Sequence, residues 1–445
     1  MVLKHAVLIL LAAAVSLTGC STIRDNSKTS SLQTTNKPER EEWFMDQALG
    51  MFVHWSVDSQ LGSVISHSMV GASDDYLDRF ISELPQSFDP KKFEPEDWAR
   101  LAKTAGMKYV VFTTKHHSGF CMFDTKTTDF NIMNTPYGHD ITRQIVQAFR
   151  RQGIAVGFYF SPDDFWVLHK QGKEVSRRRP EALPTNNPEL MAHNKAQLRE
   201  LLTKYGPIDV LFIDGVPDGL KELTWQLQPN IIITRGQMET PEQKMPDEPM
   251  PGPWEACYTL GTQWQYKPTN EEYKSGTELI EMLIEIRAKG GNFLLNIGPT
   301  PDGDIPFEQE RRARELALWL FINREAIYDI RPWHVTREGD IWFTKAKDSD
   351  TVYAFVTNTN WPKGKRKSFT IKSVRTTAQT QIEILGQSGH VLEYQTNVDP
   401  KATWTQDEDG LYISTMRAQR IYNNSRWPNP VVIRITNAAA ASGSI

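Results

Sequence analysis

The chain is 445 residues long, which exceeds one ordinary domain and predicts two, one of them as large as a (β/α) barrel. Charged residues make up 23% of the chain and the formal net charge is -4, a balance that gives no reason to expect nucleic acid as a partner. The sequence has no CxxC pair, no His-Glu-x-x-His motif and no glycine-rich phosphate loop, which argues against zinc and nucleotide sites.

Residues 1–20 are predicted to be a lipoprotein signal peptide. An apolar run over residues 6–15 is too short to span a bilayer permanently. The following Leu-Thr-Gly-Cys resembles a bacterial lipobox and implies lipidation of Cys20, although an ordinary secretory signal with a chance cysteine is the alternative. Residues 21–38 are polar and are predicted to be a tether. The expected location is therefore the bacterial periplasm or cell surface, with membrane contact only through the lipid anchor.

From residue 39 the chain alternates between apolar strand patterns and amphipathic helix patterns. Strands are predicted at 50–55, 109–114, 155–161, 208–214, 230–236, 254–258 and 290–298. Helices are predicted at 94–105, 140–152, 188–205, 275–289 and 308–324. Short apolar runs closed by turn residues are typical of buried parallel strands. The alternation predicts a (β/α) TIM-like barrel over residues 39–330.

The pattern changes near residue 331. Short strand-like runs at 341–344, 352–356, 368–371, 381–385 and 431–435 are separated by polar turns, without a helical period between them. Residues 331–445 are therefore predicted to form a C-terminal antiparallel β-sandwich.

Polar or charged side chains close almost every predicted strand of the barrel. They are His54, His116, His117, Tyr159, Asp214, Arg235 and Glu255. Because the carboxyl ends of barrel strands share one face, these side chains are predicted to line a single pocket. Two carboxylates among imidazoles and a guanidinium suit hydroxyl recognition and, best of all, glycoside hydrolysis.

Three histidines and an aspartate could instead bind a metal ion. His116 and His117 are adjacent on a predicted strand, however, and adjacent strand residues point to opposite faces. No ligand pair at i, i+2 or i, i+4 replaces them. Neither a metal nor an organic cofactor is therefore expected.

Seven short motifs occur in order along the predicted barrel. They are Gly-Met-Phe-Val-His-Trp at 50–55, Lys-His-His-Ser-Gly-Phe at 115–120, Gly-Phe-Tyr-Phe-Ser at 157–161, Asp-Gly at 214–215, Thr-Pro-Glu-Gln at 240–243, Trp-Glu-Ala-Cys at 254–257 and Gly-Gly-Asn-Phe-Leu-Leu-Asn-Ile-Gly-Pro at 290–299. Together they resemble the family 29 glycoside hydrolases, the retaining α-L-fucosidases. The resemblance implies a (β/α) barrel followed by a β-sandwich, which agrees with the strand and helix patterns.

The resemblance also implies roles for individual residues. Asp214 matches the nucleophile, and the acid/base is predicted to be Glu255, with Glu242 and Glu239 as rivals on the preceding loop. The predicted sugar-binding residues are His54, His116, His117, Tyr159 and Arg235, with Phe52, Phe212 and Trp264 as aromatic walls near the fucose methyl group.

The sequence departs from the family pattern around the sugar rather than in the catalytic groups. Ser56, Ser118 and Gln265 replace a Gly, an Asp and a Gly, and residues 66–69 replace an acid–Trp pair. The predicted function is exo-acting release of terminal α-L-fucose through a covalent glycosyl-Asp214 intermediate. An α-L-galactosidase with the same mechanism and an inactive sugar-binding lipoprotein are the alternatives, so the predicted partner is a glycan ending in α-L-fucose or a related L-sugar.

Overall fold

The computed structural model describes residues 33–357, 360–392, 395–418 and 429–441. The predicted signal peptide with Cys20, and the predicted tether up to residue 32, lie outside these ranges. The end of the predicted tether was placed wrongly. Asn36 is buried and exchanges two hydrogen bonds, of 2.9 and 2.8 Å, with the backbone of Ile233, so this stretch belongs to the folded part.

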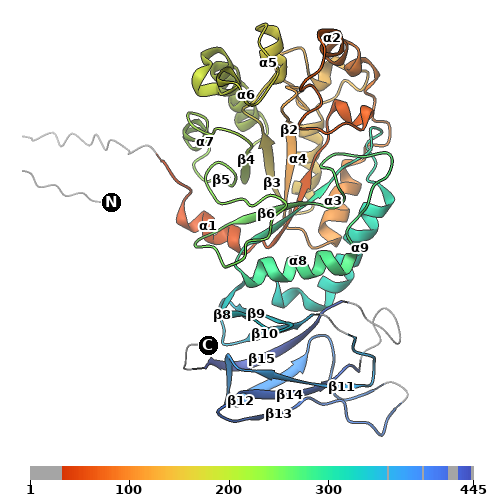
Figure 1. Ribbon diagram of the computed structural model, residues 1–445, viewed down its shortest axis with the longest axis vertical. Helices are drawn as coiled ribbons and strands as arrows, with labels where there is room; N and C mark the ends of the chain where they lie inside the picture. The colour runs from red at the N-terminus through yellow and green to blue at the C-terminus, as the bar shows by residue number, and fades with distance from the viewer. Residues whose placement is uncertain (1–32, 358–359, 393–394, 419–428, 442–445) are drawn as a thin grey trace, which may run out of the picture. The chain divides into compact units, whose positions relative to one another are not determined.

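Seven parallel strands form the central sheet, in the spatial order β5-β4-β3-β2-β1-β7-β6 (Figure 1). In chain order they are β1 (Leu49–Val53), β2 (Tyr109–Lys115), β3 (Ala155–Phe160), β4 (Val210–Ile213), β5 (Ile232–Ile233), β6 (Glu255–Thr259) and β7 (Asn292–Ile297). Every residue of these strands is buried except the half-buried Ala155. Burial on both faces explains why the strands appear in the sequence as unbroken apolar runs.

Helices cover the sheet in the alternating order that the sequence predicts. They are α1 (Pro38–Met45), α2 (Asp74–Ser82), α3 (Pro95–Thr104), α4 (Ile141–Arg151), α5 (Phe165–Lys170), α6 (Pro188–Lys204), α7 (Lys221–Leu227), α8 (Gly276–Ala288) and α9 (Phe307–Asn323). The predicted N-cap of α4 is present, because the Asp140 carboxylate accepts a 2.9 Å hydrogen bond from the Arg143 backbone. Within the described ranges, no helix is both long and apolar enough to cross a membrane.

The sheet curls as a barrel does, but the described residues do not pair β5 with β6. The strand predicted at 230–236 is reduced to the two residues of β5. The backbone of residues 239–243 runs beside β6 instead, and its carbonyls of Glu239 and Pro241 accept hydrogen bonds of 3.2 and 3.0 Å from β6. This edge segment carries two of the three candidate acids, Glu239 and Glu242.

The C-terminal part consists of two antiparallel sheets, as predicted. One has the order β12-β15-β10-β9-β8 and the other β11-β14-β13. The strands are β8 (Ile330–Glu338), β9 (Ile341–Ala346), β10 (Val352–Val356), β11 (Arg366–Ile371), β12 (Val374–Ile384), β13 (Thr403–Gln406), β14 (Leu411–Met416) and β15 (Val431–Ala440). Helix α8 packs against β8 and β9.

Candidate active site

The carboxylate of Asp214 lies where the ends of neighbouring strands meet. Asp214 directly follows β4, and its Oδ2 accepts a 2.6 Å hydrogen bond from the hydroxyl of Tyr159 near the end of β3. Its Oδ1 lies 3.3 Å from Nη1 of Arg235, shortly after β5. Nε2 of His117, in the turn after β2, lies 3.5 Å from Oδ2. The structure thus brings these four predicted residues together at the carboxyl ends of the strands.

Positive charge around Asp214 keeps its carboxylate ionised. Burial alone would raise the pKa of Asp214, but His117, Arg235, Arg177 and the Tyr159 hydrogen bond outweigh burial and lower that pKa to about 2. Burial also lowers the pKa of His117 to about 3. At neutral pH the permanent positive charges beside Asp214 are therefore the two guanidiniums. An ionised carboxylate of this kind can act as a nucleophile.

The three predicted histidines lie in the pocket as neutral rings. Nδ1 of His54 lies 2.6 Å from Oδ1 of Asn296, and the ring of His116 stacks on Tyr159 with 4.9 Å between centroids. Burial lowers the pKa of His54 to about 4 and the pKa of His116 well below its usual value. Neutral imidazoles can both donate and accept hydrogen bonds, which suits the recognition of sugar hydroxyls.

His116 and His117 contact the same pocket, contrary to the prediction that they point to opposite sides of a strand. Their ring centroids are 4.3 Å apart. Strand β2 ends at Lys115, so both histidines lie in the turn after it, where the alternation of a strand no longer applies.

His116, His117 and Asp214 form the one group of potential metal ligands found in the described ranges. One ligand atom from each lies within 4.8 Å of the others. A cation at this point would face the guanidiniums of Arg235 and Arg177, which lie 3.3 and 3.9 Å from Asp214. Like charges at these distances repel, so the donor set fits a metal ion poorly.

The predicted aromatic side chains form one wall of the pocket. The ring centroid of Phe52 lies 5.0 Å from that of Phe212 and 5.9 Å from that of Trp264. Trp264 also lies 4.9 Å from the ring of His54. Apolar rings therefore lie next to hydrogen-bonding imidazoles, an arrangement typical of small-molecule sites.

Glu255, the first choice for the acid/base, lies at the opposite end of the sheet. It is the first residue of β6 and pairs with Asn292, the first residue of β7. It is completely buried, and its carboxylate accepts a hydrogen bond from Tyr109, the first residue of β2. Burial raises its pKa to about 7. The structure argues against the predicted acid/base role, because Glu255 is completely buried at the amino ends of the strands, whereas Asp214 lies at their carboxyl ends.

Glu242 is the candidate acid that lies beside Asp214. Its Oε2 is 2.7 Å from Nη1 of Arg235, the same nitrogen that contacts Asp214. Its side chain is 41% exposed, so it can meet both a substrate and water. Glu239 is also exposed, but it contacts β6 through its backbone. The structure therefore favours Glu242.

Two residues of the site were not predicted from the sequence. Asn296 orients His54, and the signal for it was a polar residue within the apolar run of β7. Arg177 lies 3.9 Å from Asp214 and belongs to a Ser-Arg-Arg-Arg run whose composition resembles an ordinary solvated loop. No sequence signal distinguishes Arg177 from the two arginines that follow it.

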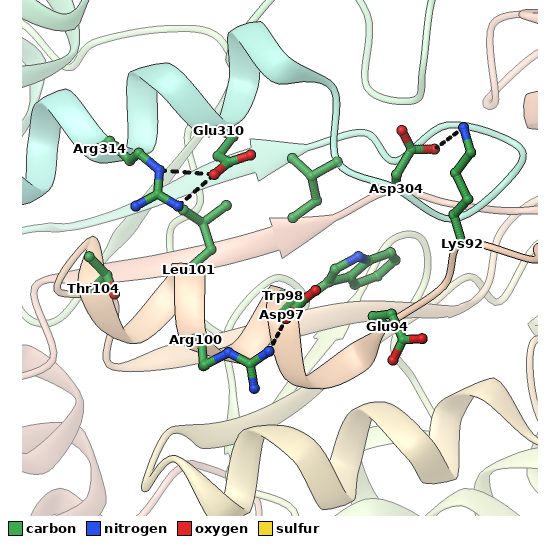
Figure 2. A pocket seen from close by; sticks show the side chains of 11 residues that line it. Lys92, Glu94, Asp97, Trp98, Arg100, Leu101, Thr104, Asp304, Glu310 and Arg314 are labelled. Atoms are coloured by element: carbon green, nitrogen blue, oxygen red, sulfur yellow. Dashed lines mark hydrogen bonds and ion pairs between the residues drawn. The ribbon is translucent and has the colours of Figure 1, made fainter.

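A cavity on the outer surface of the barrel offers a comparison, because it is also lined by charged side chains. It has a volume of about 500 Å³ and lies against α3 and α9. Figure 2 shows that its charged side chains pair with one another, Arg314 with Glu310, Arg100 with Asp97 and Lys92 with Asp304. The charges within each pair neutralise each other, whereas Asp214 and Glu242 both contact the guanidinium of Arg235.

Comparison with known proteins agrees with this geometry. The sequence profile described as alpha-L-fucosidase matches residues 16–325, and that of the alpha-L-fucosidase C-terminal domain matches residues 335–436. Plasma alpha-L-fucosidase of Rattus norvegicus is 28% identical over 391 residues, with 77% of this chain and 82% of that protein covered. Tissue alpha-L-fucosidase of Mus musculus is 29% identical over 418 residues, with 84% and 87% covered. The structure of alpha-L-fucosidase isoenzyme 1 from Paenibacillus thiaminolyticus superposes with a TM-score of 0.72 at 26% identity, covering 89% of this chain and 98% of that one.

Proposed function

Because the chain belongs to the alpha-L-fucosidase family of glycoside hydrolases, we propose that it releases terminal α-L-fucose from glycans with retention of configuration at the anomeric carbon. The observation that carries this proposal is that Asp214 and Glu242 share one nitrogen of Arg235. An Asp214 oxygen lies 3.3 Å from that nitrogen and a Glu242 oxygen lies 2.7 Å from it. The separation of the two oxygens therefore cannot exceed the sum of these distances. Retaining glycosidases hold their carboxyl groups about 5–5.5 Å apart, whereas inverting enzymes need about 6.5–9.5 Å.

Asp214 and Glu242 take the two catalytic roles in this proposal. The Asp214 carboxylate attacks the anomeric carbon while Glu242 donates a proton to the glycosidic oxygen, and the bond to the leaving group breaks. Glu242, now ionised, takes a proton from water, whose oxygen displaces Asp214 from the sugar. Tyr159 and Arg235 hold the Asp214 carboxylate in place during both steps. The buried histidines at the base of the pocket favour a terminal sugar, so the enzyme is exo-acting.

The aromatic wall supports fucose as the sugar. Phe52, Phe212 and Trp264 offer apolar surface that suits the methyl group of a 6-deoxy sugar. An apolar pocket discriminates against one added hydroxyl by only about 10²-fold, so α-L-galactosides are the competing substrates. We expect kcat/KM for an aryl α-L-fucoside to exceed that for the matching α-L-galactoside. A ratio of roughly 10³ towards the galactoside would instead indicate a site that hydrogen-bonds the hydroxyl.

The stereochemical course tests the mechanism. Proton NMR of an aryl α-L-fucoside digest should show α-L-fucose as the first sugar released, before mutarotation. With Asp214→Gly, added azide should restore turnover and give β-L-fucosyl azide, because a small anion replaces the missing nucleophile. Release of β-L-fucose first would contradict retention. Binding of fucose without turnover of any aryl glycoside would identify a sugar-binding protein instead.

We also propose that a bacterial membrane anchors the chain through a lipid on Cys20. The Leu-Thr-Gly-Cys stretch after the apolar run supports this proposal. Cys20→Ala should release the protein from the membrane fraction, whereas Cys121→Ala, which removes a buried thiol of the fold, is the matched control. Unchanged membrane partitioning of Cys20→Ala would contradict the anchor.

A further inference from the structure

Arg177 reaches the pocket from a loop that lies outside all seven motifs. The loop joins α5 to a short helical turn that starts at Pro180. Nε of Arg177 donates a 2.5 Å hydrogen bond to Oδ2 of Asp163. The Asp163 side chain is 5% exposed, and its Oδ2 lies 3.8 Å from Nδ1 of His117. One edge of the guanidinium is therefore fixed against the wall of the pocket.

The other edge of the guanidinium makes no hydrogen bond within the described ranges. Nη2 lies 3.9 Å from Oδ1 of Asp214, beyond hydrogen-bond distance, and no residue in the described ranges hydrogen-bonds either terminal nitrogen of Arg177. The side chain is 36% exposed. Arg235 differs, because its terminal nitrogens already bind Asp214, Glu242 and the carbonyl of Thr240. Arg177 thus presents free, positively charged donors beside Asp214.

We propose that Arg177 is a substrate-binding residue, whose terminal nitrogens donate hydrogen bonds to oxygen substituents of the sugar bound at Asp214. The proposal rests on the proposed function, because it takes Asp214 as the place where the sugar binds. Asp163 holds the guanidinium by its Nε edge and so orients the two terminal nitrogens towards the sugar. Preorganised donors of this kind bind without the cost of fixing a flexible side chain.

The proposal predicts different defects for two substitutions of Arg177. Arg177→Met keeps the aliphatic stem but removes both donors and charge, so we expect KM and the Kd for L-fucose to rise roughly 10- to 100-fold, the usual worth of a hydrogen bond to a charged group. Loss of the charge also raises the pKa of Asp214, which moves the acidic limb of the kcat/KM profile to higher pH. Arg177→Lys keeps the charge but not the forked donors of a guanidinium. The acidic limb of the kcat/KM profile should therefore keep its position while KM rises.

Arg178 supplies the matched control. It has the same chemistry one residue later, it is exposed, and its side chain has no hydrogen bond or ion pair within the described ranges. Arg178→Met should therefore leave kcat, KM and Kd unchanged. Asp163→Asn is the second control, because it weakens the loop attachment while it keeps the guanidinium.

The binding arm of the experiment is calorimetric titration of L-fucose into each variant, built both alone and with Asp214→Asn. Arg177→Met should weaken binding more than Asp163→Asn does, and Arg178→Met should not weaken it. A Kd for Arg177→Met within twofold of that for Arg178→Met would overturn the proposal. If the unsubstituted chain neither binds L-fucose nor hydrolyses an aryl α-L-fucoside, the proposed function itself fails, a result that is distinct from a loss confined to Arg177→Met.

Discussion

Two carboxylates at opposite ends of the same parallel sheet, Asp214 and Glu255, differ in almost every physical property. Asp214 follows a strand, keeps 18% of its side chain exposed and has a pKa lowered to about 2. Glu255 begins a strand, is completely buried and has a pKa raised to about 7. Guanidiniums contact the first, whereas the hydroxyl of Tyr109 contacts the second.

The difference shows that an acid's position, at the amino or the carboxyl end of a strand, decides its protonation state more than the type of residue does. At the carboxyl ends the loops diverge and leave room for charged partners and substrate. At the amino ends helices and neighbouring strands close over the sheet, and desolvation favours the neutral acid. The same carboxyl group is therefore ionised at one end, as a nucleophile must be, and is a packed polar group at the other.

The largest expected effect comes from replacing Asp214 by its amide, and the same replacement of Glu255 is the comparison. Asp214→Asn should lower kcat by roughly 10³-fold or more, because the nucleophile is lost. Glu255→Gln should lower kcat less than tenfold, since the amide oxygen can still accept the hydrogen bond from Tyr109. Aryl α-L-fucoside kinetics check both variants. A large loss of activity in Glu255→Gln, with an unchanged melting temperature, would return Glu255 to the active site.

Glu242→Gln should have the next largest effect. Removal of a general acid/base costs about 10²- to 10⁴-fold, and the loss falls mainly on substrates with poor leaving groups. We therefore expect natural glycans to suffer far more than dinitrophenyl fucosides, whose leaving group needs no proton. Glu239→Gln, three residues earlier on the same segment, is the control, and its activity on both kinds of substrate should stay near that of the unsubstituted chain. The opposite ranking would move the acid/base role to Glu239.

Tyr159→Phe should have an intermediate effect. The Tyr159 hydroxyl donates a 2.6 Å hydrogen bond to Asp214, and such a bond to a charged group corresponds to roughly 10- to 100-fold in rate. Loss of the bond also raises the pKa of Asp214, so the acidic limb of kcat/KM should move to higher pH. Tyr109→Phe, which removes the partner of Glu255, should leave that limb where it is. A shifted limb in Tyr109→Phe would contradict the separation of the two ends.

The smallest expected effect is on stability, and its sign should differ between the two acids. Glu255 holds its proton up to a pKa of about 7 when folded, against 4.5 ordinarily, so its contribution to stability falls as pH rises between these values. Compared with the unsubstituted chain, Glu255→Gln should therefore have a free energy of unfolding that is higher at pH 8 than at pH 4, by on the order of 2 kcal/mol.

Asp214 is the reverse case. Its folded pKa of about 2 lies below the ordinary 3.8, so it stabilises the fold above pH 3.8 and loses this contribution as pH falls towards 2. Asp214→Asn should lower the free energy of unfolding by about 2 kcal/mol at neutral pH. Thermal unfolding across pH measures both variants. Parallel stability curves for the two substitutions would show that burial alone governs both sites.

Particular residues show how far local pattern predicts this site. The runs that became β1, β2, β3, β4 and β7 were predictable because both faces of each strand are buried, which leaves an unbroken apolar run. The sequence therefore predicted that the polar residues at the ends of β1 to β4, such as His54 and Asp214, lie close together. The strand predicted at 230–236 failed in extent, since only Ile232 and Ile233 find strand partners on β4.

The sequence by itself determined the fold class, the family and the pocket around Asp214, because these depend on periodicity and on residues adjacent to strand ends. Only the tertiary structure favours Glu242 over Glu255 as the acid/base. The choice depends on where β6 begins relative to β7, and on a segment that runs beside β6 and brings Glu242 within 2.7 Å of Arg235. The approach of Arg177 to Asp214 depends likewise on the packing of a loop that no local pattern describes. Contacts between distant segments are set by packing of the whole chain, and the periodicity of a single segment carries no record of them.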